Sequence, residues 1–214
     1  MCIRDRYYLL SPVQLLRFLQ GHTVFGPDLV LFYYGILLVT AGFTLIFVPL
    51  PIFLRQELGW PGGAVFAAYI VHSLTSVVAY RWARQGIMRW GHRPTLGLAL
   101  LARSGAFATL ALVGRLLPGW MVPALFVVTG VTWAFFQLAA TAIVSRLAPE
   151  GFKGQALGAY NAIAGLGNVL GAVVGGVLFD FLGFSAAFLV GASVVFLTIP
   201  LLLLEARPLK TAGG

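Results

Sequence analysis

A row of polar and aromatic side chains follows one apolar stretch of the chain. Its members are spaced four residues apart, which places them on one side of a helix: Thr129, Trp133, Gln137 and Thr141. Hydroxyl, amide and indole groups can hydrogen-bond a bound organic molecule, and they can equally bond neighbouring helices. The other tryptophans of the chain stand at the ends of apolar stretches, so Trp133, in the middle of one, is the informative member.

Three further side chains have hydrogen-bonding or titratable groups within apolar stretches. Asn161 and Asn168 are seven residues apart and share a helix face, so they can contact a solute or bond another helix. His72 changes charge near neutral pH, which fits either proton coupling or a neutral, hydrogen-bonded core residue. Arg103 also lies within an apolar stretch, where it can pair with a carbonyl group or bind a solute.

The sequence argues against an enzyme and against a metal or other cofactor. Ser193 in Gly-Ala-Ser is similar to the nucleophile of intramembrane serine proteases, but such a serine needs a histidine within hydrogen-bond reach. All three histidines precede it, and none is predicted near its end of the membrane. One cysteine and three scattered histidines do not make a zinc ligand set either.

The composition indicates an integral membrane protein. Of 214 residues, 60% are hydrophobic and 9% charged, and the mean hydropathy is +0.95. A soluble domain has about a quarter charged residues. The net charge of +8 is scattered between apolar stretches and forms no basic face interleaved with aromatics, which excludes nucleic acid as a partner.

Six apolar stretches are long enough to cross a membrane core, which takes about 20 residues. Pro49 and Pro51 fall near the far end of the first, where a kink is tolerated. A turn at Gly183 separates the last two. The predicted spans are residues 29–54, 63–80, 94–114, 119–147 and 155–181, and a sixth that ends near residue 204.

The charges predict the orientation of these spans. Four arginines occupy the segment 81–94, which is predicted to be a loop between the second and third spans. With both termini on that side, eleven basic residues lie on it and two on the other. Because basic loops stay in the cytoplasm, residues 1–28 and 205–214 are predicted to be cytoplasmic segments of a cell-membrane protein. Residues 1–6 resemble a spurious start, and a truncated N-terminus is expected.

Glycines recur every four residues along the fifth span. Such a repeat of small residues lets two helix backbones approach closely. The members expected to pack in this way are Gly167, Gly171 and Gly175.

Two segments resemble the major facilitator superfamily. Arg89-Trp-Gly91-His92-Arg93 is similar to the end of the loop motif Gly-x-x-x-Asp-Arg-x-Gly-Arg-Arg, found between the second and third helices of each half. Met88 replaces the Asp and Arg84 the first Gly, so the charge latch of the motif is incomplete. Residues 146–161 resemble the loop and helix start that open the fifth helix of a C-terminal half.

The resemblance implies an all-α membrane protein with six transmembrane helices as an inverted 3+3 repeat, spanning residues 29–204. It implies the C-terminal half of a secondary active transporter, which moves a small organic or lipophilic solute by alternating access. The partners would be the missing N-terminal half, the lipid bilayer and the solute, whose cavity the first and fourth helices line. A polytopic membrane scaffold or a channel-type pore subunit is the alternative that the sequence leaves open.

Overall fold

The computed structural model describes residues 27–114, 116 and 121–204. The predictions for residues 1–26 and for the tail 205–214 lie outside the described residues. Every regular element of the described part is an α-helix, which confirms the all-α class. The helices are α2 (Pro27–Phe47), α3 (Leu50–Gln56), α4 (Gly62–Trp90), α5 (His92–Val113), α6 (Met121–Leu147) and α7 (Lys153–Leu204).

Five helical segments are long and apolar enough to cross a membrane: Asp28–Gln56, Gly62–Trp90, His92–Val113, Met121–Leu147 and Lys153–Leu203. Their outer surfaces carry large apolar side chains, among them Phe66 at 70% exposure and Phe181 at 82%. Water would disfavour such a surface, whereas lipid accommodates it. The predicted integral membrane protein is confirmed.

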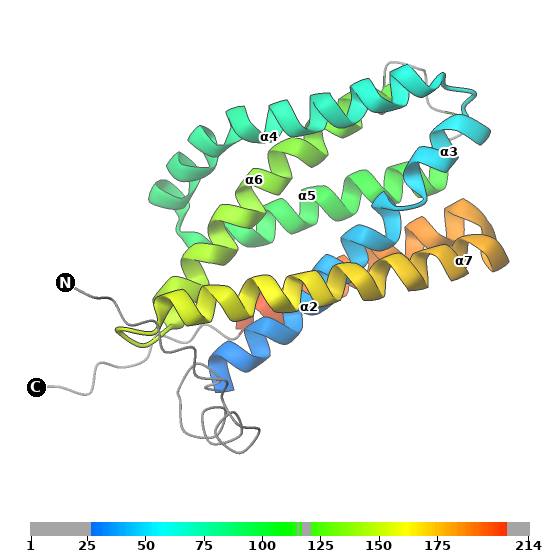
Figure 1. Cartoon of the computed structure of the whole chain (residues 1–214). Helices are drawn as coiled ribbons and strands as arrows, with labels where there is room; N and C mark the ends of the chain where they lie inside the picture. The colour runs from blue at the N-terminus through cyan, green and yellow to red at the C-terminus, as the bar shows by residue number, and fades with distance from the viewer. Residues whose placement is uncertain (1–26, 115, 117–120, 205–214) are drawn as a thin grey trace, which may run out of the picture.

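The longest helix, α7, is bent back on itself at Gly183. The φ angle of Gly183 is 77°, which a residue with a side chain rarely adopts. Figure 1 shows the two arms of α7 as a hairpin, yellow before the bend and orange to red after it. The predicted turn at Gly183 is therefore present.

Helix α2 packs against both arms of α7. Residues 167–175 of the first arm lie beside residues 37–45 of α2 in the same order, so these two helices run parallel. The second arm passes α2 in the reverse order, with Leu202 beside Gly35 and Val195 beside Gly42. The two arms are thus antiparallel to each other.

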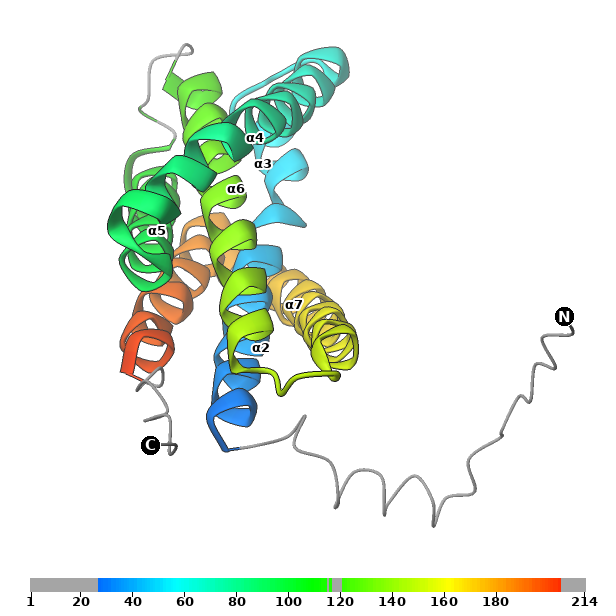
Figure 2. The ribbon, with the colours of Figure 1, turned by 90° about the vertical axis from the view of Figure 1, so that its left-hand side faces the viewer.

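The remaining helices form a second group. Helix α4 packs on α6, while α5 packs on α6 and on α7 and joins the groups. Figure 2 shows α4 in the upper part of the view, α2 and the labelled arm of α7 in the lower part, and α6 passing between them. The core between the groups is apolar, and its fully buried members include Phe32, Ile36, Leu100, Phe136 and Phe188.

Two prolines interrupt the first predicted span, as expected. Helix α2 ends at Phe47 and α3 begins at Leu50, after Pro49. Pro51 has no N–H with which to bond the carbonyl of Phe47 four residues earlier. The hydroxyl of Tyr69 in α4 donates to that carbonyl instead, at 3.1 Å, so the Phe47 carbonyl keeps a hydrogen bond at the break.

The predicted loop 81–94 is wrong. Helix α4 continues through it to Trp90, and the chain breaks only at Gly91, whose φ angle is 88°. Arginine, alanine, glutamine and methionine favour helices, and residues 81–93 contain no proline that would end one. The arginines therefore extend a helix beyond the apolar part of the span.

Candidate functional site

The row on α6 makes its contacts with three different helices. Each step of four residues turns a helix by about 400°, so the row drifts by about 40° per step. Thr129 contacts His72 of α4 and Arg103 of α5, whereas Gln137 contacts Tyr160 of α7. The row is thus a shallow spiral across the inside of the bundle.

Thr129 is 6% exposed, and all its polar atoms have partners. Its hydroxyl donates to the carbonyl of Phe126 at 3.0 Å and lies 3.1 Å from Nδ1 of His72. Which of the two groups donates in this bond depends on the tautomer of the His72 ring. His72 is half-buried and lies 5.4 Å from the ring of Phe47, measured between centroids.

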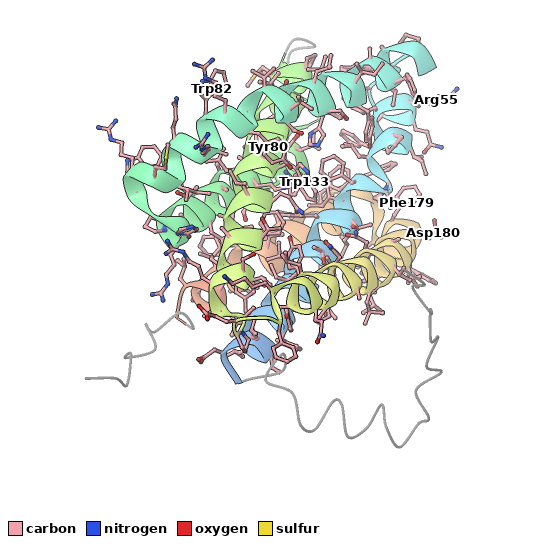
Figure 3. The ribbon with its side chains drawn as sticks, turned by 60° about the vertical axis from the view of Figure 1, so that its left-hand side comes forward. Arg55, Tyr80, Trp82, Trp133, Phe179 and Asp180 are labelled. Carbon is pink, nitrogen blue, oxygen red and sulfur yellow. The ribbon has the colours of Figure 1, made fainter. Side chains whose placement is uncertain are left out.

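Trp133 is half-buried at the centre of an aromatic cluster. Its ring centroid lies 6.1 Å from that of Phe43 in α2 and 5.7 Å from that of Phe136. Figure 3 shows Trp133 on the inner side of α6, toward α2, and distant from the end of the bundle where Arg55 and Asp180 lie. The predicted mid-span position of Trp133 is therefore what the structure shows.

Gln137 and Thr141 continue the row toward the other end of α6. The hydroxyl of Tyr160 donates to Oε1 of Gln137 at 3.1 Å. The hydroxyl of Thr141 donates to the Gln137 carbonyl at 2.8 Å, within its own helix. Both residues are partly exposed, so a molecule beside α6 and α7 can reach them.

Asn161 and Asn168 are exposed on the first arm of α7. Asn168 accepts a hydrogen bond from the hydroxyl of Thr44 in α2, at 2.8 Å. Between residues 156 and 179 the other exposed side chains are apolar, with Leu166, Val169 and Val173 each more than half exposed. These amides are polar groups on an otherwise apolar helix surface.

The glycines of the first α7 arm divide into two sets. Gly167, Gly171 and Gly175 face α2, where an added Cβ would come within 2.5 Å of the Leu37 carbonyl oxygen, 2.8 Å of Ala41 Cα and 2.7 Å of the Leu45 carbonyl oxygen. Gly158, Gly165 and Gly176 have open space around them. The first set is where the backbones of α2 and α7 touch.

The motif residues Arg89, Gly91, His92 and Arg93 form the junction of α4 and α5. The hydroxyl of Thr95 donates to the Gly91 carbonyl at 2.6 Å and ties the turn to the start of α5. Arg89 is exposed, while His92 and Arg93 are half-buried. Met88, where the motif has its Asp, is 68% exposed.

Sequence reasoning missed Tyr160, Thr44 and Phe43, which hold the predicted residues in place. Their partners lie on helices 23 to 124 residues away along the chain, and nothing in the spacing signalled these pairs. Across residues 27–114, 116 and 121–204 no three His, Cys, Asp or Glu side chains gather as metal ligands would.

Five apolar helical segments of membrane length define a multi-pass membrane protein, whose interior holds polar and aromatic side chains. The family model that matches is the Major Facilitator Superfamily, over residues 32–213. The chain belongs to this superfamily, a transporter family.

A curated relative is the multidrug resistance protein MdtG of Proteus mirabilis (strain HI4320). The two are 27% identical over 183 residues, which covers 79% of this chain and 42% of MdtG. The chain thus spans less than half the length of the relative that it matches.

Proposed function

We propose that the chain is the C-terminal six-helix half of a secondary active transporter, which exports a small organic or lipophilic solute by alternating access. The observation that carries this proposal is the exposure of Asn161 and Asn168 on a membrane-length helix. The Thr44 hydroxyl bonds Oδ1 of Asn168, but amide N–H groups that face hydrocarbon leave their hydrogen bonds unmade, which is costly. These amides therefore need a polar neighbour, which a second half and a solute pathway between the halves would supply.

The contacts support six crossings arranged as two trios. At 52 residues α7 would be about 78 Å long if straight, more than twice the thickness of a bilayer core. Its antiparallel arms, counted separately, are the fifth and sixth crossings. In an inverted repeat of two trios, the first crossing corresponds to the fourth and the second to the fifth. The packing of the first crossing, α2, on the fifth, in α7, then has its counterpart in the packing of the fourth, α6, on the second, α4.

The positions of the helix ends support the placement of the basic residues of α4 at one end of the bundle. Gly35 and Gly97 both lie beside the end of α7, at Leu202 and Leu203, so α2 and α5 start where α7 ends. At the opposite end Phe53 contacts Phe184, with centroids 5.2 Å apart. The arginines of α4 belong to the first end, which the positive-inside rule assigns to the cytoplasm.

The proposed solute faces aromatic and weakly polar groups. Trp133, Phe47, Gln137 and Asn168 offer ring surfaces and neutral hydrogen-bonding groups, which suits a lipophilic molecule. Export is proposed because the relative MdtG is called a multidrug resistance protein. The N-terminal half of the same transporter would cover the exposed amides.

Cysteine labelling of the full-length transporter that contains this chain tests the proposal. In a Cys2→Ser background, Gln137→Cys and Asn168→Cys should react with a membrane-impermeant maleimide. Two matched positions should not: Ala140→Cys, which is 0% exposed in the core, and Leu197→Cys, whose 73% exposed side chain would face lipid. If Gln137→Cys and Asn168→Cys stay as unreactive as these controls from both sides of sealed vesicles, the row is structural and a scaffold becomes the better description.

A channel-type pore subunit predicts a different pattern. In a channel, one conformation would expose Asn168→Cys to reagents from both sides at once. Alternating access predicts that conditions favouring labelling from one side reduce labelling from the other. Simultaneous labelling at equal rates would contradict the transporter mechanism.

A further inference from the structure

Arg103 is a buried cation in the middle of α5. Its side chain is 1% exposed, and its guanidinium carbon lies 4.2 Å from the ring centroid of Phe43 and 5.5 Å from that of Trp133. Phe47 and Phe107 complete the surrounding rings, at 5.2 and 5.3 Å. Arg103 thus occupies an aromatic cage built from α2, α5 and α6.

Hydrogen bonds satisfy only part of this guanidinium. One terminal nitrogen donates to the carbonyl of Thr129 at 2.7 Å and approaches the hydroxyl of Thr132 at 3.4 Å. The Nε atom is buried without a hydrogen-bond partner. The ring faces and the carbonyl are partially negative, but none of these groups has a full charge.

No carboxylate in the part of the chain that the structure describes pairs with Arg103. The described acids are Asp28, Glu57, Glu150 and Asp180, at helix starts, in loops or at the bend of α7. His72, the nearest other titratable side chain, carries no negative charge. The positive charge at this depth is therefore uncompensated within the described residues.

The cage is also one wall of the proposed pathway. Trp133 and Phe47 are half-buried, and their ring centroids lie 5.5 and 5.2 Å from the guanidinium carbon, so the same two side chains contact Arg103 and keep part of their surface exposed. A solute in contact with the exposed part of Trp133 would lie about 9 Å from the charge, which is the 5.5 Å contact plus about one van der Waals separation. At an effective dielectric constant of about 20, unit charges at this distance shift a binding constant by about twentyfold.

We propose that Arg103 makes this pathway selective for lipophilic anions over lipophilic cations of the same shape. The inference rests on the proposed function, because it needs a solute beside Trp133. The aromatic rings hold the apolar body of the solute, and the field of Arg103 attracts a negative group and repels a positive one. Arg103 is thus a specificity-determining residue that acts through the ring wall.

Tetraphenylborate and tetraphenylphosphonium are suited to testing this proposal, because they have nearly the same shape and opposite charges. Equilibrium dialysis with the purified full-length transporter in a neutral detergent gives a Kd for each ion, corrected for its partition into empty micelles. Wild type should bind the borate at least tenfold more tightly. Arg103→Gln should lose most of this preference, and Arg103→Lys should keep it.

Arg55→Gln is the matched control, because it removes a charge of the same sign from an exposed position at the end of α3. It should leave the preference unchanged. Equal binding of the two ions by wild type, or tighter binding of the phosphonium, overturns the anion selectivity while the transport pathway stands. This wild-type measurement can overturn the selectivity even if Arg103→Gln does not fold.

Absence of binding by either ion also overturns the selectivity, and the maleimide labelling then decides separately whether a pathway exists. A preference for the borate that persists unchanged in a folded Arg103→Gln protein assigns the selectivity to another group. Loss of the preference in Arg103→Gln alone, with Arg103→Lys and Arg55→Gln as wild type, supports the proposal.

Discussion

The hydroxyl of Tyr69 donates to the carbonyl of Phe47 at 3.1 Å, at the point where Pro51 leaves that carbonyl without a backbone donor. Helix α4 thus holds the break between α2 and α3 through one side-chain hydrogen bond. A proline break in a membrane helix is tolerated where a neighbouring helix satisfies the freed backbone group in this way.

Tyr69→Phe should therefore destabilise the protein by about 1 kcal/mol, because it removes the donor and leaves a buried carbonyl unpaired. The ring contacts of Tyr69 with Phe47 and Phe126 remain in the variant. Thermal unfolding in detergent measures the effect. Tyr34→Phe is the control, since Tyr34 is 56% exposed, and an equal loss in both variants would contradict the role of the Tyr69 hydroxyl.

Thr129→Val should cost about 1–3 kcal/mol, because it deprives His72 Nδ1 of its hydrogen-bond partner inside the bundle. Thr129→Ser keeps the hydroxyl and should cost less. Thr109→Val provides the comparison, since the Thr109 hydroxyl bonds only the Gly105 carbonyl of its own helix. In denaturant unfolding, Thr129→Val should lose much more free energy of unfolding than Thr109→Val. The reverse order would show that the contact with His72 contributes nothing to stability.

Gly171→Ala and Gly176→Ala should change stability in opposite directions. At Gly171 a methyl group would meet the backbone of Ala41, so α2 and α7 must separate, at a cost of about 1–3 kcal/mol. At Gly176 there is open space, and alanine should gain up to about 1 kcal/mol through its better helix propensity. If the melting temperatures of both variants fall equally, the close contact between α2 and α7 is not the reason that glycine is needed at Gly171.

The sequence predicted the helical spans because length, hydropathy and the glycine turn at Gly183 are local properties. It misjudged residues 81–90 because charge was taken as a sign of a loop, although arginine is a good helix former. The environment of Arg103 could not be predicted, since Phe43 and Phe47 lie about 60 residues earlier along the chain. The prediction from four-residue spacing also assumed that the α6 row runs straight along the helix. Each step turns by about 40°, or about 80° over two steps, so Thr129 and Gln137 have different neighbours.

The orientation of α4 gives a direct test of the topology. Gly63 and Gln85 are both exposed and lie near opposite ends of this helix, about 33 Å apart at 1.5 Å per residue. In a Cys2→Ser background, the full-length protein with Gln85→Cys should be labelled by an impermeant maleimide only from the cytoplasmic side, and with Gly63→Cys only from outside. The arginines of α4 determine this direction because basic segments resist translocation.

Two further positions test whether α7 crosses the membrane twice. Glu150→Cys, before α7, should be labelled from the same side as Gln85→Cys, and Asp180→Cys, at the bend, from the side of Gly63→Cys. Labelling of Gln85→Cys and Gly63→Cys from one side would show that α4 does not cross. If Gln85→Cys is labelled only from outside and Gly63→Cys only from the cytoplasm, α4 crosses the membrane but in the orientation opposite to the predicted one. If Asp180→Cys is labelled only from the cytoplasm, the two arms of α7 do not cross, and the six-helix arrangement is wrong.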